Sequence, residues 1–255
     1  MTTTSTARPR YRIAPTPAIG IGVLAAYLVV FYAVWMFNDI DYERVGDSAS
    51  TLLRWYVSPL AAGAVVLVVA TTWLGWWRPA LHEEHRAGPR WLVIAPLYMV
   101  GVSLLMLATK SYDSTTSTML LWLVLGSIGV GFCEELATRG VLLTGLRGGM
   151  GEMGAWFLSC LLFGLLHLPN WWFGAGPGAM AQVALVFGAG SMLYVVRRWS
   201  GTLVLAMFVH GFWDFSSFIG EDAPAWITPL VFLNTILGVA LGLVVVRRNR
   251  RAVAA

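Results

Sequence analysis

Charged residues are scarce in this chain of 255 residues: they make up 12%, against 58% hydrophobic residues. A soluble globular domain carries about 25% charged residues, so the composition excludes an ordinary soluble fold. The chain has two cysteines, Cys133 and Cys160, and both lie in apolar stretches. This excludes the disulfide framework of a small secreted domain. The sequence also lacks solenoid-type repeats, low-complexity tracts and cofactor-binding motifs.

Apolar residues form blocks long enough to cross the hydrocarbon core of a bilayer, which is about 30 Å thick. The blocks do not alternate as barrel strands do, whereas helices satisfy their own backbone polar groups in lipid. The first block is too long for a signal peptide and no cleavage pattern follows it. The sequence therefore predicts an all-α, polytopic membrane protein. Its eight predicted transmembrane helices are 19–37, 56–77, 91–108, 118–146, 153–168, 179–196, 202–219 and 227–246.

Basic residues are concentrated in every second predicted loop. Eight spans place both termini on one side of the membrane, and that side holds 13 of the 17 Lys and Arg residues. Such loops lie in the cytoplasm, so we expect a cell-membrane protein with cytoplasmic termini. The net charge of +4 then reflects membrane topology and not a nucleic-acid partner. The 13 residues are Arg8, Arg10, Arg12, Arg78, Arg86, Arg90, Arg147, Arg197, Arg198, Arg247, Arg248, Arg250 and Arg251.

One membrane domain accounts for most of the chain. His82 and His85 lie in the connection 78–90, which we expect to be a solvated cytoplasmic loop; a metal pair there lacks a convincing third ligand. The predicted divisions are a basic tail (1–17), an eight-helix domain (18–247) with its catalytic core at about 118–219, and a basic C-terminal tail (248–255).

The fourth predicted helix carries three ionisable side chains where lipid should surround it. Glu134, Glu135 and Arg139 fall within one and a half turns, and each ion at a helix centre costs roughly 2.5 to 3.5 kcal/mol. Glu135 and Arg139 have the spacing and order that favour an ion pair. Glu134 lies about 100° around the helix from Glu135. It therefore points to another face of the helix, away from this ion pair, and is free for chemistry.

Two further helices carry histidine in apolar surroundings. His167 lies near the end of the fifth helix, and His210 precedes Asp214 by four residues on the seventh. Glu134 and His167 can hold a water for attack on a carbonyl. His210 would donate to the oxyanion, with Asp214 as its orienting partner or, if protonated, a second donor. Counting from the predicted span ends puts His167 nearer the outer face than Glu134, so we expect the fourth helix to be tilted or kinked.

Three other interpretations are open at this point. The polar groups can form a buried structural ion-pair network, although such a network does not need two histidines. Glu134, His167 and His210 can bind zinc, although no His-Glu-x-x-His is present. Cys133 can act as a nucleophile, but its thiolate needs a positive environment and has two neighbouring carboxylates.

Together these residues resemble the CPBP family of intramembrane proteases, the CAAX-protease and bacteriocin-processing group also called Abi. Its pattern is Glu-Glu-x-x-x-Arg, Phe-x-x-x-His and His-x-x-x-Asn or Asp on three helices, and every position matches. The resemblance implies an eight-helix bundle and a metal-independent glutamate protease without a cofactor. It implies catalytic roles for Glu134, His167, His210 and Asp214, and structural support from Glu135, Arg139 and Phe163.

Residues and resemblance together predict an intramembrane endopeptidase that acts on membrane-anchored, prenylated or otherwise hydrophobic peptides in contact with membrane lipid. Asp214 stands where the prenyl-protein branch has asparagine, so cleavage of CAAX sequences is not itself implied. The alternative is a non-catalytic bacteriocin-immunity or scaffold protein with the same fold. A third interpretation is a small transporter with Glu134 and Asp214 as proton carriers, which the three-part motif disfavours.

Overall fold

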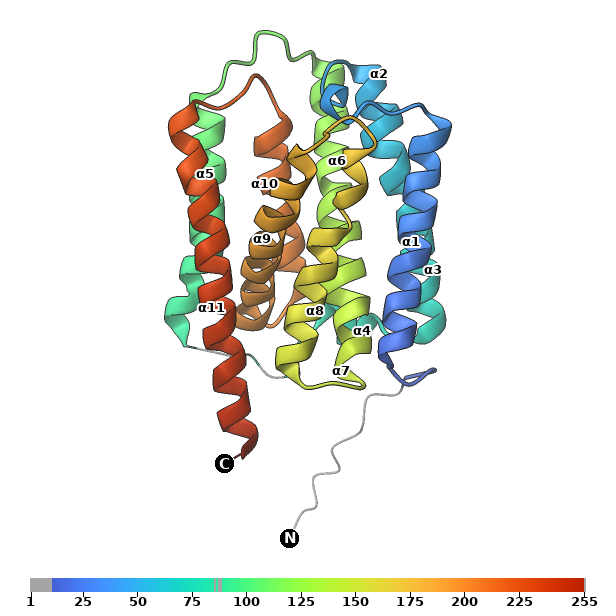
Figure 1. Cartoon of the computed structure of the whole chain (residues 1–255), viewed down its shortest axis with the longest axis vertical. Coiled ribbons are helices and arrows are strands. Elements are labelled where there is room, and N and C mark those ends of the chain that lie inside the picture. The colour runs from blue at the N-terminus through green and yellow to red at the C-terminus, as the bar shows by residue number, and fades with distance from the viewer. Residues whose placement is uncertain (1–10, 85, 87–88, 255) are drawn as a thin grey trace.

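Helices that run side by side form the described part of the chain in the computed structural model (Figure 1). The structure describes residues 11–84, 86 and 89–254, with side chains up to Arg248. Over these residues the fold is all-α, with one isolated β-bridge between His82 and Thr202. Seven segments are long and apolar enough to span a membrane, so this is a multi-pass membrane protein. They are Pro17–Phe37, Ala49–Leu74, Arg90–Thr109, Ser117–Arg147, Glu152–Trp171, Gly178–Ser200 and Ala225–Arg248.

Several spans combine an α-helix with a short 3-10 or π-helical stretch. The first half of the chain contains α1 (Pro17–Phe37), η1 (Tyr42–Arg44), α2 (Ala49–Thr51), π-helical η2 (Leu52–Val57), α3 (Ser58–Leu74), α4 (Trp77–Leu81), η3 (Arg90–Val93), α5 (Ile94–Thr109) and α6 (Ser117–Glu135). The second half contains π-helical η4 (Leu136–Leu142), α7 (Leu143–Arg147), α8 (Glu152–Leu165), η5 (Leu168–Trp171), α9 (Gly178–Ser200), α10 (Leu203–Phe218), η6 (Ala225–Ile227) and α11 (Thr228–Ala254).

Most predicted spans agree with the structure to within a few residues, but the second begins at Ala49 and not at 56. Ser48 and Thr51 form a capping box there, in which each side chain accepts from the other residue's backbone N–H. The cap starts the helix before the apolar block begins.

The count of eight spans is not confirmed, because α10 is shorter than the predicted span 202–219. Thr202 caps its start and Ile219 is already extended. Its 16 residues extend about 24 Å, less than the bilayer core of about 30 Å. The helix α10 packs against α5, α6 and α9, so lipid does not surround it on all sides.

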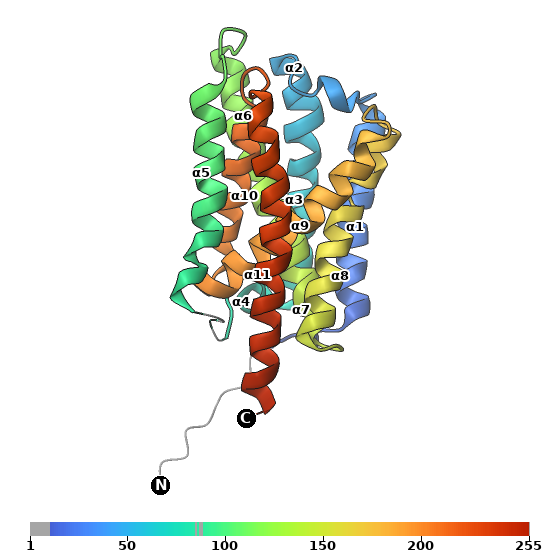
Figure 2. The same ribbon diagram turned by 60° about the vertical axis from the view of Figure 1, so that its left-hand side comes forward.

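The start of α1 and the end of α11 lie at the same end of the bundle (Figures 1 and 2). The backbone N–H groups of Arg12 and Ile13 donate to the carbonyl of Leu74, so this part of the predicted tail 1–17 lies against α3. The helix α11 continues through 248–254, where a separate tail was predicted. Arg8, Arg10, His85 and the side chains of Arg250 and Arg251 lie outside the described residues.

Candidate active site

Two glycines let α6 and α10 approach each other closely. A Cβ on Gly211 would lie 2.5 Å from the Ser127 carbonyl oxygen, and one on Gly131 would collide with the backbone of α10. Only glycine fits at such a close approach of two backbones. The contact sets Glu134, three residues after Gly131, beside His210, which directly precedes Gly211.

His210 faces two carboxylates that are near but not hydrogen-bonded to it. Its Nε2 lies 3.9 Å from Glu134 Oε2 and 3.8 Å from Asp214 Oδ1, beyond hydrogen-bond distance. All three side chains are largely buried. Neither carboxylate has a hydrogen-bond partner among the described residues, so both remain available to a water or a substrate.

Glu135 is fully buried and contacts two partners through one oxygen. Its Oε1 lies 2.9 Å from Arg139 Nη2 and 2.8 Å from His210 Nδ1. The predicted pairing of Glu135 with Arg139 is therefore confirmed, and the guanidinium also lies 3.8 Å from the ring centroid of Phe163. The prediction that Asp214 orients His210 is wrong, because Glu135 makes the orienting hydrogen bond.

The π-helical segment η4 follows Glu135 directly, and all its residues are buried. The Thr138 hydroxyl donates to the Glu134 carbonyl at 2.5 Å and accepts from Arg139 Nη1 at 2.6 Å. Single π-turns inside α-helices are frequent at functional sites. The fourth span was expected to be tilted or kinked. In the structure it changes from α-helical to π-helical geometry directly after the motif glutamates.

His167 lies just beyond the end of α8, with its Nδ1 3.0 Å from the Phe163 carbonyl oxygen. A carbonyl only accepts, so Nδ1 carries the proton and Nε2 keeps a lone pair. His167 is 15 residues after Glu152 and Glu134 is 13 before Arg147, and a short turn joins those two helix ends. His167 is therefore two residues, or about 3 Å, further from these helix ends than Glu134, the same small difference in depth that the predicted span ends gave.

One cavity of about 280 Å³ is lined by all four predicted catalytic side chains, Glu134, His167, His210 and Asp214. Residues from the segment between α1 and α2 and from the C-terminal parts of α8 and α10 line it, and these parts of the chain lie in the half of the bundle away from the termini (Figure 1). The rest of its wall is mostly apolar. Its aromatic members include Phe31, Trp35, Trp55, Phe163, Trp213 and Phe218.

Sequence reasoning missed the other polar residues of this cavity, among them Tyr42, Asn170 and Gln182. These three form a hydrogen-bonded chain, and Asn170 is buried. Amides in or beside apolar spans are a usable signal. It was overlooked because the predicted fifth span ended at 168, which left Asn170 in a loop.

No three His, Cys, Asp or Glu side chains within the described ranges are arranged to hold a metal ion. Cys133 is fully buried, and its thiol contacts the Leu60 carbonyl at 3.3 Å. This environment has no cation to stabilise a thiolate. It matches a packed structural cysteine.

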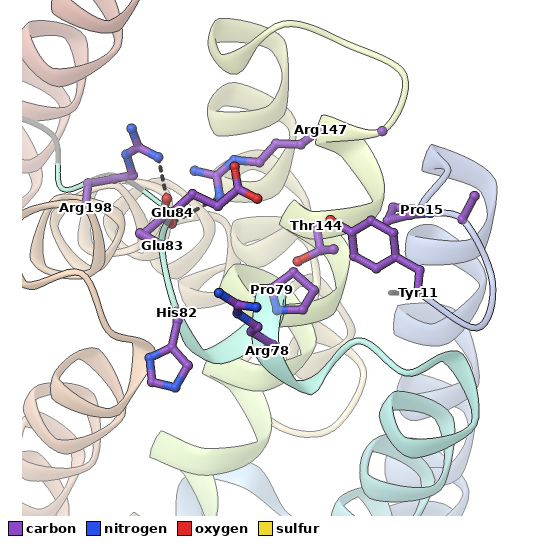
Figure 3. Close-up of a pocket in the computed structure, with 12 residues that line it drawn as sticks. Tyr11, Pro15, Arg78, Pro79, His82, Glu83, Glu84, Thr144, Arg147 and Arg198 are labelled. Atoms are coloured by element: carbon purple, nitrogen blue, oxygen red, sulfur yellow. Dashed lines mark hydrogen bonds and ion pairs between the residues drawn. The ribbon is translucent and has the colours of Figure 1, made fainter. Parts of the chain in front are cut away.

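A second cavity, of about 780 Å³, lies at the end of the bundle that holds the termini (Figure 3). In its wall, Glu83 Oε1 lies 2.7 Å from Arg197 Nε and 3.1 Å from Arg147 Nη1, and Oε2 contacts Arg198. Burial opposes ionisation of Glu83, but the three arginines outweigh it and lower the pKa of Glu83 to about 2. The connection 78–90, expected to be solvated, is therefore buried at Glu83.

Glu152 completes this ion-pair cluster from the start of α8. It accepts from Arg147 Nε and Nη2 at 2.9 and 2.6 Å and from the Tyr194 hydroxyl at 2.5 Å. Three arginines that were expected to be loop charges thus form buried or partly buried ion pairs with Glu83 and Glu152. None of the predicted catalytic residues lines this second cavity.

The three motifs, the cavity that they line and the helices that carry them fall in one stretch of the chain. Residues 115–216 match the Rce1-like family. The matching model is described as type II CAAX prenyl endopeptidase Rce1-like, which confirms the resemblance stated from the motifs. The Rce1-like stretch contains all seven predicted site residues, and the match indicates an intramembrane protease. No curated protein and no solved structure matches the chain.

Proposed function

We propose that the chain is an intramembrane endopeptidase that hydrolyses peptide bonds with a water activated by Glu134 and His167. The observation that carries this proposal is the single cavity lined by Glu134, His167, His210 and Asp214 within a bundle of membrane-spanning helices. Ionisable side chains are costly in hydrocarbon and mark function when they face a shared cavity. The match of residues 115–216 supports protease chemistry.

Glu134 is the proposed general base. Its carboxylate is 3.9 Å from His210 Nε2 and has no hydrogen-bond partner in the described structure, which leaves it free to accept from water. His167 offers a second acceptor, since the Phe163 carbonyl engages its Nδ1. The water oxygen bonds to the substrate carbonyl carbon while its proton passes to Glu134. That proton then goes to the departing amine as the C–N bond breaks.

His210 and Asp214 are the proposed oxyanion donors. Because His210 Nδ1 donates to Glu135, Nε2 can donate only when the ring is protonated. Three carboxyl groups within 3.9 Å of the ring nitrogens favour that protonated form. With protonated His210 and Arg139 as cations, three carboxylates leave one negative charge in excess. A proton retained on Asp214 removes the excess and makes this group a donor.

The proposed substrate is a hydrophobic, membrane-anchored peptide. The cavity walls are mostly apolar and aromatic, and such walls favour apolar side chains or a lipid group. The description of the matching family makes prenylated peptides the first class to test.

We also propose that α10 is the eighth crossing and that both termini lie in the cytoplasm. Three neighbouring helices pack against α10, so it need not span the lipid alone, and basic residues gather at the end that holds the termini. The catalytic cavity then lies toward the outer face. In intact cells, an impermeant maleimide should label Ser48→Cys but not Arg248→Cys; the opposite labelling contradicts this orientation.

The proposed hydrolysis is metal-independent. This is supported by the absence, among the described residues, of any three His, Cys, Asp or Glu side chains arranged to hold a metal ion. Incubation with EDTA or 1,10-phenanthroline should leave kcat/KM unchanged. Loss of activity that added zinc restores would instead support a zinc enzyme.

Comparative proteomics of membranes tests the function directly. Cells that express the native chain should contain new peptide termini that are missing with Glu134→Gln, which keeps size but removes the base. Both proteins must be present in the membrane at equal levels. Identical termini, together with an unchanged cellular phenotype, would support the non-catalytic scaffold.

A further inference from the structure

A chain of three hydrogen-bonding side chains runs along one wall of the active-site cavity, and the hydrolysis described above does not use it. Asn170 Nδ2 donates to Gln182 Oε1 at 2.9 Å, and Gln182 Nε2 donates to the Tyr42 hydroxyl at 2.8 Å. All three residues line the cavity. Because both amides donate in the same direction, the chain ends at the Tyr42 hydroxyl, whose own hydrogen is free to be donated.

Backbone hydrogen bonds hold this chain beside the catalytic histidine. The Asn170 N–H donates to the His167 carbonyl at 3.1 Å, and the Tyr42 N–H donates to the Phe173 carbonyl at 2.7 Å. Gly174 permits this contact: its φ is 120°, and a Cβ there would lie 3.2 Å from the Tyr42 backbone nitrogen and 2.7 Å from Asp41 Oδ1. The position of Tyr42 is therefore fixed relative to His167.

The Tyr42 hydroxyl keeps its proton at any working pH. Burial raises the pKa of Tyr42; the hydrogen bond from Gln182 lowers it, but the carboxylates of Asp214 and Glu134 raise it further, to about 12. No described residue accepts this hydrogen. Tyr42 is half-buried and lines the cavity, so the acceptor is whatever molecule occupies the cavity, a water in the resting protein or a substrate when one is bound.

We propose that the Tyr42 hydroxyl donates a hydrogen bond to a backbone carbonyl of the peptide substrate, with Gln182 and Asn170 as positioning residues. This inference rests on the proposed function, because it requires a peptide in the cavity. A neutral carbonyl suits the site better than a carboxylate, since Glu134, the proposed base, already brings a negative charge to the same cavity. The hydrogen bond sets which peptide bond of the substrate reaches Glu134.

The test compares Tyr42→Phe with the native chain and with Tyr98→Phe, all full-length in detergent. The Tyr98 hydroxyl donates to the Leu230 carbonyl at 2.8 Å and does not line the cavity, so Tyr98→Phe is a matched loss of one hydroxyl. The probe is a fluorogenic peptide that ends in a farnesylated CAAX sequence. A contact made equally in the ground and transition states affects KM alone. Tyr42→Phe should raise KM about 3- to 10-fold, Gln182→Leu less, and Tyr98→Phe not at all.

Each outcome decides the inference. An unchanged KM in folded Tyr42→Phe overturns it and leaves the proposed function intact. A fall in kcat at constant KM also overturns it, because the hydroxyl would then act in the chemical step. If Tyr42→Phe does not fold, Gln182→Leu decides by the same criterion. If the native chain and Glu134→Gln give the same background rate on the probe, this inference fails for prenylated substrates, whereas identical peptide termini in the proteomic comparison would overturn the proposed function as well.

Discussion

Two buried polar clusters lie at opposite ends of the bundle and differ in how their carboxylates are paired. In the cluster near the termini, called the basal cluster below, both carboxylates make contacts with arginine at 3.1 Å or less. In the active-site cavity, Glu134 and Asp214 have no charged partner closer than 3.8 Å. The basal cluster consists of Glu83, Arg147, Glu152, Arg197 and Arg198.

The difference separates stability from chemistry. A carboxylate that arginines saturate has no lone pair to offer a water, and breaking a buried pair is strongly destabilising. A buried carboxylate without partners stabilises nothing by itself and can take up a proton. Removing a charge from each cluster should therefore give opposite results: lost catalysis with stability retained, or lost stability with catalysis retained.

The largest expected effect is on catalysis, from Glu134→Gln. General-base catalysis contributes about 10²- to 10⁴-fold, so kcat/KM on the fluorogenic peptide should fall by at least about 100-fold, with Tm within error of the native chain. The matched control is Glu221→Gln, which removes an exposed carboxylate and should change neither quantity. A large fall in Tm for Glu134→Gln would show that this carboxylate is structural.

Glu83→Gln should have the largest effect on stability. The substitution leaves Arg197, which is fully buried, without a carboxylate partner, and loss of one partner of a buried pair costs about 3–5 kcal/mol. Thermal unfolding in detergent should show a clear fall in Tm, while kcat/KM of the folded fraction stays near the native value. Its exposed neighbour offers the control Glu84→Gln, which should leave Tm unchanged. Equal effects of the two substitutions would contradict the basal cluster's role.

Acid should reduce the difference between the native chain and Glu83→Gln. The pKa of Glu83 is lowered from 4.5 to about 2, so its ionised form stabilises the fold fully above about pH 4.5, and this contribution is lost as pH falls through about 2. The contribution amounts to about 3 kcal/mol. The Tm difference should be greatest near neutral pH and shrink below pH 4.5. A difference that grows on acidification would contradict this sign.

The smallest of these effects, but on both quantities, is expected from Glu135→Gln. Glu135 lies beside the cavity yet is paired as the basal carboxylates are, with Arg139 and His210. Arg139 would keep its contacts with the Thr138 hydroxyl and the Phe163 ring, so the cost should stay below the about 3–5 kcal/mol of a fully broken buried pair, and Tm should fall moderately. The kcat should fall as well, because His210 loses the carboxylate that orients it. Unchanged Tm and kcat would show that Glu135 neither stabilises the fold nor orients His210 for catalysis.

Local geometry made part of the site predictable from sequence. Helical spacing separates Glu134 from Glu135 by about 100°, and this correctly assigned Glu135 to Arg139. The lengths of the apolar blocks located seven spans. The second partner of Glu135 was not foreseen, because no rule of spacing says which groups of α10 will face α6.

Contacts between distant segments were beyond the sequence. Glu83 and Arg147 are 64 residues apart, and Tyr42 and Gln182 are 140 apart. Glu83 and Arg147 each had a plausible local explanation from the sequence. Glu83 was expected to be part of a solvated loop, and Arg147 to be a loop charge that marks the cytoplasmic side. Only the packing of the helix ends shows that these charges are withdrawn from water.

The spacing of the catalytic groups depends on two glycines, which have no side chain. At Gly131 and Gly211 the backbones of α6 and α10 are in direct contact. A methyl group at either position would force the two helices apart. Neither glycine touches a substrate or carries a proton. A design that transfers this site to another scaffold must nevertheless include both glycines as well as the glutamates and histidines, because the two glycines set the distance between the helices that carry the catalytic groups.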